Sequence, residues 1–238
     1  MRTIEFNGYI DDEEIWGDEV TPEHLREMLY GEDGSNEDDV TLRLNSYGGS
    51  CVAATRMYDM IRDYPGLVHV VVSGVSASAA TVVMSAGSTL QITPGSLVMI
   101  HNPKMCACGE VRDFQQAIRL LETTKNSIIA IYRKRSKVGA DELARMMDET
   151  TWMTAEEAVQ NGLADAVLED STKAPTNAAE RTPRLSIEEA QKKVAAFYTR
   201  GEAPKRSLQG SRFPASGRTN CSGGWRCLRR NERSNANA

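Results

Sequence analysis

The chain of 238 residues has few aromatic side chains and no long apolar run, and each shortage excludes a class of protein. Its apolar runs are interrupted by serine, glycine, histidine or threonine, so none approaches the ~20 residues that a membrane span needs. The first residues, MRTIEFNGYIDDEE, are acidic and contain no apolar core, so no secretory signal is expected. We therefore expect a cytoplasmic protein without a membrane partner.

Cysteines are also few, and their spacing argues against both disulfides and a metal site. There are five of them, an odd number, in a chain with no expected export signal. Free thiols in a reducing compartment are the expected state. The gaps between the cysteines do not match the usual spacing of zinc ligands, so no metal and no cofactor are predicted. The five positions are Cys51, Cys106, Cys108, Cys221 and Cys227.

Acidic and basic side chains are distributed unevenly along the chain. The net charge is −5, but residues 201–238 carry eight basic and two acidic side chains, a net +6 that leaves −11 for residues 1–200. The acidic charge of residues 1–200 does not favour nucleic acid as a partner, whereas the basic tail can contact an acidic partner.

Strand and helix patterns alternate along the first 170 residues, and this alternation predicts an α/β fold with a largely parallel sheet. We expect a domain over 1–170, a linker over 171–185, one helix over 186–200 and a basic, disordered tail over 201–238. Within the domain, strands are predicted at 3–10, 40–46, 66–74, 89–93, 97–101 and 163–169, and helices at 21–31, 51–64, from about 78, 110–135 and 154–162.

Three serines lie in one stretch of small residues, SGVSASAATVVMSAG, that follows a buried strand. A serine nucleophile needs a base within hydrogen-bond reach, and histidine is the usual base near neutral pH. His24 lies among charges in a first helical turn, and His69 lies within the strand that leads to the serines. His101 follows a strand and precedes Asn-Pro, where a loop can hold a catalytic group, so it is the favoured base. The residues alone leave open which serine it would activate: Ser73, Ser76 or Ser78.

A glycine pair supplies a candidate for the anion-stabilising part of such a site. NSYGGS (45–50) lies between a predicted strand and a predicted helix, and its glycines allow the backbone to turn with amides pointing outward. Acyl transfer needs backbone N–H groups directed at the developing oxyanion. A glycine pair alone most often indicates a tight turn. Its interpretation as an oxyanion site is supported here by the serines and His101.

Four segments, in order and in spacing, resemble the proteolytic subunit of the Clp protease family. Within it the chain is most similar to the head maturation (prohead) proteases of tailed phages and prophages. The resemblance covers about residues 3–169, and the four segments that carry it are LRLNSYGGSCVAATRMYDMIR, SGVSASAATVVMSAG, VMIHNP and WMTAEEAVQNGLADAV.

The resemblance implies a fold, a reaction and a set of site residues. The fold would be the spiral of ββα units that Clp and crotonase proteins share, with a long handle helix over 110–135. The nucleophile would be Ser78, the fifth residue counted from Gly74, and the base would be His101. The oxyanion amides would come from Gly49 and from Ala79, the residue after the nucleophile.

One position departs from the family pattern and leaves the third catalytic residue open. The family has an aspartate two residues before the aromatic of its last motif, and Thr150 stands at that position here. Asp148 and Glu149 are the nearest acids, and Asp148 is the tentative third member of the triad. A Ser-His dyad assisted by Thr150 or water is the alternative.

The predicted function is a serine endopeptidase that processes scaffold or capsid protein during phage head maturation. The family's axial loop, which meets a ring ATPase, has no counterpart before TIEFNG, and no Gly-x-x-x-x-Gly-Lys phosphate loop occurs. We therefore expect proteolysis without an ATPase partner, by a homo-oligomer that is ring-like by resemblance. The alternatives are a crotonase-like acyl-CoA hydratase or isomerase, and a structural protein with this fold and impaired catalysis.

Overall fold

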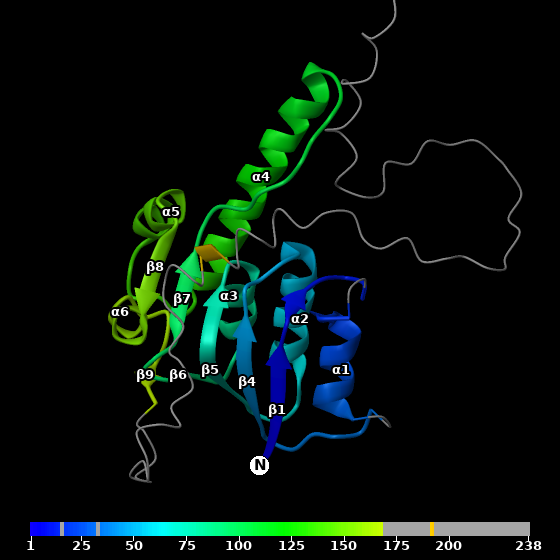
Figure 1. Cartoon of the computed structure of the whole chain (residues 1–238), viewed down its shortest axis with the longest axis vertical. Helices are drawn as coiled ribbons and strands as arrows, with labels where there is room; N and C mark the ends of the chain where they lie inside the picture. Colours follow the sequence, from blue (N-terminus) through cyan, green and yellow to red (C-terminus); the bar gives the residue numbers. More distant parts are fainter. Residues whose placement is uncertain (15–16, 32–33, 169–190, 193–238) are drawn as a thin grey trace, which may run out of the picture.

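The computed structural model describes residues 1–14, 17–31, 34–168 and 191–192. It shows a mixed α/β fold in which a largely parallel sheet lies beside several helices (Figure 1). The elements in chain order are β1 (Arg2–Asn7), β2 (Tyr9–Ile10), β3 (Glu19–Val20), α1 (Pro22–Tyr30), β4 (Val40–Ser46), α2 (Cys51–Asp63), β5 (Val68–Ala77), α3 (Ala79–Met84), β6 (Thr89–Ile92), β7 (Leu97–Ile100), α4 (Val111–Tyr132), α5 (Ala140–Asp148), β8 (Thr151–Thr154), α6 (Ala155–Gln160) and β9 (Ala166–Val167).

The main sheet is forked at β5, and this fork positions the site. Its strands run in the order β1-β4-β5-β6-β9, and all of these pairs are parallel. The first half of β5, His69 to Val72, pairs with β6, whereas its second half, Val75 to Ala77, pairs with β7. β7 in turn pairs antiparallel with β8. The carboxyl end of β5 therefore lies beside the carboxyl end of β7.

The core lies mainly on one face of the sheet. Alternate side chains of β1, β4 and β5 join the buried side chains of α1, α2 and α3 in a single apolar cluster, which matches strands that pack on helices. A smaller cluster on β5 and β7 consists of Val75, Ala77, Leu97 and Met99, with Tyr47 and Trp152 packed against it. The end of β5 thus packs in an apolar cluster of its own, apart from the main core.

Two predicted helix starts are confirmed in atomic detail. Thr21 caps α1, because its hydroxyl accepts the His24 N–H at 3.2 Å, and Pro22 occupies the first helical position. Thr154 and Glu157 form the expected capping box at the start of α6. These local signals fix helix starts without help from the rest of the fold.

Several predicted bounds differ from the structure. The strand expected over 3–10 is divided at Gly8, whose φ of 139° favours glycine, so β1 pairs with β4 while β2 pairs with β3. The strand expected over 66–74 continues to Ala77, because β7 supplies a second partner. The closing strand expected over 163–169 shortens to β9. Helix α5 and strand β8 were not predicted.

The long helix expected over 110–135 is present as α4, which projects beyond the sheet (Figure 1). None of the described helices is long and apolar enough to cross a membrane. The predicted linker over 171–185 and the tail over 201–238 lie outside the described residues, and so does the predicted helix over 186–200 except for Gln191 and Lys192.

Candidate active site

Ser78 occupies the sharp turn between β5 and α3. Its φ of 57° and ψ of −127° are rare for a residue other than glycine. A strained serine between a strand and a helix presents its hydroxyl at the end of a sheet, as the nucleophile turn of α/β-hydrolases does. Such strain persists only where the surroundings hold it in place, which makes this turn a candidate functional feature.

His101 reaches Ser78 because the fork in β5 places β7 beside it. Ala77 is in register with Met99, and the Ser78 N–H donates to the Met99 carbonyl at 2.9 Å. His101, the residue after β7, places its Nε2 2.7 Å from the Ser78 Oγ. The two side chains are largely buried, with Ser78 8% and His101 7% exposed. The structure thus brings together the predicted nucleophile and the predicted base.

The environment of His101 keeps its imidazole neutral. Burial, and secondarily the positive charge of Lys104, lower the pKa of His101 to about 4. A neutral imidazole can accept the Ser78 hydroxyl hydrogen at Nε2 when Nδ1 carries the ring hydrogen. His101 can therefore act as a base at neutral pH.

The Gly48–Gly49 turn packs directly against the nucleophile. A Cβ on Gly48 would lie 2.6 Å from the Ala77 carbonyl oxygen and 2.8 Å from the Ala79 nitrogen. Strand β2 anchors the turn, because the Ile10 N–H donates to the Gly48 carbonyl at 2.9 Å and the Ser50 N–H donates to the Ile10 carbonyl at 2.8 Å. Only glycine allows so close an approach of the two backbones.

The N–H groups of Gly49 and Ala79 are the predicted oxyanion donors. Among the hydrogen bonds of the described residues, none uses either of these two N–H groups. Ala79 is the first residue of α3, so its N–H has no partner inside the helix. Two unused amides in adjacent turns beside a serine hydroxyl are what an acyl-transfer site needs.

The structure places Asp148 near the His101 loop but not in a hydrogen bond with His101. Its Oδ1 accepts from Asn102 Nδ2 at 2.7 Å and from Lys125 Nζ at 2.6 Å. These two contacts lower the pKa of the Asp148 carboxyl. Asn102 and Lys125 were not singled out in the sequence, because nothing local shows that α4, α5 and the loop after β7 meet.

The other two candidates for the third position lie in the same segment. Glu149 bonds Arg145, four residues earlier on α5, at 2.7 Å. Thr150 has a φ of 55°, which is unusual for a β-branched side chain, and it lies exposed between α5 and β8. Among the described residues, neither of these two side chains is hydrogen-bonded to His101.

The remaining serines and histidines have structural surroundings. Ser76 is fully buried, and the Ser73 hydroxyl accepts from Arg43 at 2.9 Å. His69 Nδ1 lies 2.8 Å from Thr89 Oγ1 on the neighbouring strand, as expected for a packed strand residue. His24 is a partly exposed neighbour of Glu14. The elimination that favoured His101 agrees with these positions.

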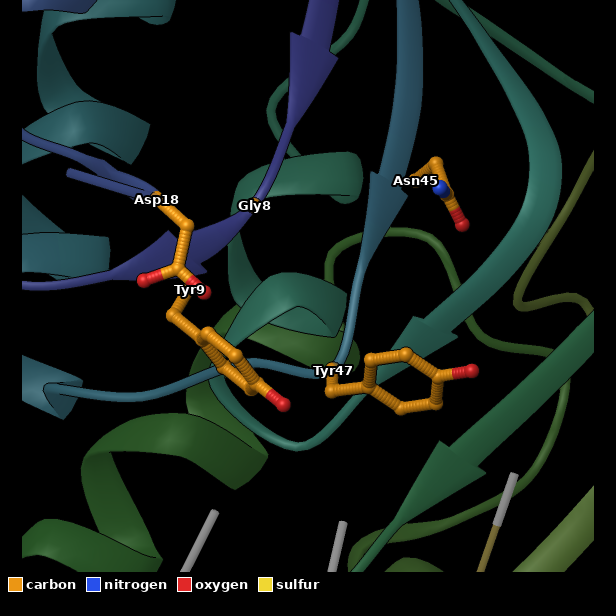
Figure 2. A pocket seen from close by; sticks show the side chains of 5 residues that line it. All are labelled: Gly8, Tyr9, Asp18, Asn45 and Tyr47. Carbon is orange, nitrogen blue, oxygen red and sulfur yellow. The ribbon is translucent and has the colours of Figure 1, made fainter. Parts of the chain in front are cut away.

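A surface cavity of about 310 Å³ lies near this region, but its lining includes neither Ser78 nor His101. Figure 2 shows its lining residues, with the Tyr9 and Tyr47 rings 6.3 Å apart between centroids. The lining residues are Gly8, Tyr9, Asp18, Asn45 and Tyr47. The described residues contain no cluster of three or more side chains suited to a metal ion, and Cys51 and Cys106 are free thiols.

Comparison with known proteins identifies relatives of this chain. A family model described as Clp protease matches residues 9–171. ATP-dependent Clp protease proteolytic subunits from Bacteroides fragilis and Bacteroides thetaiotaomicron are each 31% identical over 154 residues, which is 63% of this chain and 74% and 70% of those proteins. The subunit from Porphyromonas gingivalis is 31% identical over 149 residues, 62% of this chain and 67% of that protein. The matched region includes every residue of the candidate site.

Proposed function

We propose, because the chain belongs to the Clp protease family, that it is a serine endopeptidase with Ser78 as nucleophile and His101 as general base. The observation that carries this assignment is the 2.7 Å contact between Ser78 Oγ and His101 Nε2. It also argues against a structural protein with impaired catalysis. A crotonase-type reaction would use a carboxylate base, whereas a hydroxyl and an imidazole lie beside the proposed oxyanion donors.

The proposed reaction follows from the geometry. Ser78 Oγ attacks the peptide carbonyl carbon while His101 Nε2 takes the hydroxyl proton. The carbonyl oxygen becomes an oxyanion and accepts hydrogen bonds from the N–H groups of Gly49 and Ala79. His101 then gives its proton to the leaving amine, and the C–N bond breaks. Water, deprotonated by His101, hydrolyses the acyl-enzyme and restores the Ser78 hydroxyl.

Asp148 is proposed as a positioning residue that acts on His101 through Asn102. The Asn102 N–H donates to the Met147 carbonyl at 3.2 Å, and its side chain donates to Asp148. Lys125 of α4 forms an ion pair with the same carboxylate oxygen of Asp148. This arrangement braces the loop that begins at His101 against the end of α5. It offers a substitute for the aspartate that Thr150 replaces.

Replacing Asp148 with asparagine is expected to lower kcat about tenfold, far less than the loss of a triad carboxylate costs, because Asp148 acts through Asn102 and does not touch His101. The matched control is Glu149→Gln, which changes the neighbouring acid and should leave kcat unchanged. Equal losses in both variants would contradict the role of Asp148. A loss near 10⁴-fold, typical of a triad carboxylate, would instead place Asp148 directly behind His101. Steady-state kinetics on a fluorogenic peptide measure the effect.

A homo-oligomer is part of the proposal. Val111, Phe114 and Ile118 recur along one side of α4 and are 74%, 47% and 56% exposed. Exposed apolar side chains that gather on one surface commonly mark an interface. Since α4 projects from the body of the molecule (Figure 1), it is placed to contact another copy of the chain. A ring-like assembly is proposed from the resemblance.

The proposed substrates are the scaffold and capsid proteins of a phage head, cleaved without an ATPase partner. The support is the similarity of the four sequence segments to prohead proteases. The relatives named above are ATP-dependent by name, so cleavage with ATP and an ATPase can be distinguished by experiment from cleavage without them. Substrate class and energy requirement are therefore assayed together.

We expect size-fractionated oligomer to cleave a scaffold or capsid precursor at defined sites with no nucleotide present, as read by mass spectrometry of the products. The monomer fraction is the comparison, and Ser78→Ala oligomer is the control for contaminating proteases. Cleavage that requires a ring ATPase and ATP, or that occurs only in the monomer fraction, would contradict the proposal.

A further inference from the structure

Two buried polar side chains outside the Ser78–His101 pair contact the nucleophile turn. Thr81 of α3 is fully buried, and Tyr132, the last residue of α4, is 2% exposed. The Thr81 hydroxyl donates to the Ser78 carbonyl and lies 2.5 Å from the Tyr132 hydroxyl. The Thr81 N–H donates to the same carbonyl at 3.0 Å. A chain of hydrogen bonds thus runs from α4 to the backbone of the nucleophile.

The directions of these hydrogen bonds follow from the atoms involved. A carbonyl oxygen can only accept, so the single hydroxyl hydrogen of Thr81 is directed at Ser78. The contact between the two hydroxyls must then be donated by Tyr132 and accepted by Thr81. Burial raises the pKa of Tyr132 above its ordinary value, which keeps that hydrogen in place. Hydrogen bonds aligned in this way polarise and strengthen one another.

The Ser78 carbonyl and the Ala79 N–H belong to one peptide group. A trans peptide is planar, so its C=O and N–H point in opposite directions and rotate together. Two donors from Thr81 fix the direction of the C=O, and they thereby fix the direction of the N–H. That N–H is one of the two proposed oxyanion donors and is otherwise unused among the described hydrogen bonds.

The backbone at this point needs such support. Ser78 has a φ of 57°, and the strain at this residue could be relieved by rotation of the adjoining peptide groups. Rotation of the Ser78–Ala79 peptide would turn the N–H away and direct a carbonyl oxygen towards the oxyanion. Such a carbonyl would repel the negative charge that the reaction creates. The contacts that resist this rotation come from Thr81 and, behind it, from Tyr132.

We propose that Thr81 and Tyr132 are positioning residues that hold the Ser78–Ala79 peptide with its N–H directed into the oxyanion site. The inference rests on the proposed serine peptidase function and adds two residues to its machinery. Neither side chain touches the substrate, and both act through the orientation of one backbone amide. Tyr132 also makes the last turn of α4 part of the support for the nucleophile turn.

Thr81→Val is the first test, because valine keeps the shape of threonine and removes the hydroxyl. We expect kcat on a fluorogenic peptide to fall at least tenfold, a fraction of the 10²- to 10³-fold that loss of an oxyanion donor costs. KM should change less than twofold, since the ground state does not carry the charge. The inhibition constant of a peptide boronate, which mimics the tetrahedral intermediate, should rise by the same factor as kcat falls.

Two further variants separate positioning from structural damage. Thr81→Ser retains the hydroxyl and should restore kcat to within threefold of the original protein. Tyr132→Phe leaves Thr81 bonded to the Ser78 carbonyl but removes the group behind it, so an intermediate loss is expected. Tyr132→Phe also preserves the packing of α4, so it decides the question if Thr81→Val does not fold.

Ser85→Ala is the matched control. Ser85 follows the last residue of the same helix, is buried, and donates to the Thr81 carbonyl at 2.7 Å, away from the Ser78–Ala79 peptide. It should leave kcat and boronate inhibition unchanged. Equal effects of Ser85→Ala and Thr81→Val, or a loss in Thr81→Val that appears in KM alone, would overturn the inference. Failure of the proposed function looks different, because the unmodified protein would then not react with a fluorophosphonate probe at Ser78.

Discussion

Ser78→Ala is expected to lower the rate of peptide hydrolysis by about 10⁶-fold and to abolish labelling by a fluorophosphonate probe. His101→Ala should have a similar effect, because members of a catalytic unit are not additive and Ser78 without its base is a weak nucleophile. The measurement is kcat on a fluorogenic peptide, together with mass spectrometry of the labelled protein. Both variants should remain folded by circular dichroism.

The neighbouring Ser76 provides the control for this prediction. It lies in β5, two residues before Ser78, it is fully buried, and its hydroxyl has no hydrogen-bond partner among the described residues. Ser76→Ala removes an unsatisfied polar atom, so activity should be kept and stability should not fall. Labelling that survives in Ser78→Ala but disappears in Ser76→Ala would identify Ser76 as the nucleophile and refute the assignment.

Gly48→Ala is expected to lower kcat/KM by at least 10²-fold, the magnitude associated with loss of an oxyanion donor. The added methyl group would lie 2.8 Å from both the Ala79 nitrogen and the Ser78 Cβ, closer than real contacts allow. The two turns must separate, and the proposed donors on Gly49 and Ala79 then no longer point at one oxygen. Peptide kinetics, boronate inhibition and thermal unfolding measure the separate effects on catalysis and stability.

Gly34→Ala is the control for backbone strain. Gly34 also has a positive φ, 70°, but a Cβ there would meet nothing within 4 Å. Its substitution should cost about 1 kcal/mol of stability from the left-handed conformation alone and leave kcat/KM intact. If both glycine variants lose activity to the same degree, strain rather than contact with the nucleophile explains the loss. If Gly48→Ala keeps full activity, the close packing of the two turns is not needed for catalysis.

The sequence supplied the chemical groups of the site but not the pairing that assembles them. His101 emerged by elimination among three histidines, and its place after a strand followed from local pattern. Ser78 could be separated from Ser73 and Ser76 only by resemblance, because all three lie among small residues. The contact between Ser78 and His101 depends on the fork in β5, where the partner changes from β6 to β7. Strand pairing of this kind is set by tertiary packing and leaves no local signal.

The contacts of Asp148 could not be predicted from the sequence either. Helix α5 and strand β8 were missed, although α5 has a buried side that includes Leu143, Met146 and Met147. The family pattern directed attention to Thr150, and Asp148 was chosen from the two nearest acids because a small shift of the loop could bring it to His101. The structure instead shows a bridge through Asn102 and Lys125, which come from two other parts of the chain. Contacts between distant segments could not be read from one sequence.

The anchoring of the glycine turn by β2 has a consequence for protein engineering. The nucleophile, the base and both proposed oxyanion donors lie within residues 35–168, whereas Ile10, which holds the Gly48–Gly49 turn through two backbone hydrogen bonds, lies before the exposed loop at Gly34. A chain divided in that loop would keep the reacting groups on one fragment and the anchor on the other. Reassembly of the two fragments, driven by the pairing of β1 with β4, would then act as a switch that completes the oxyanion site.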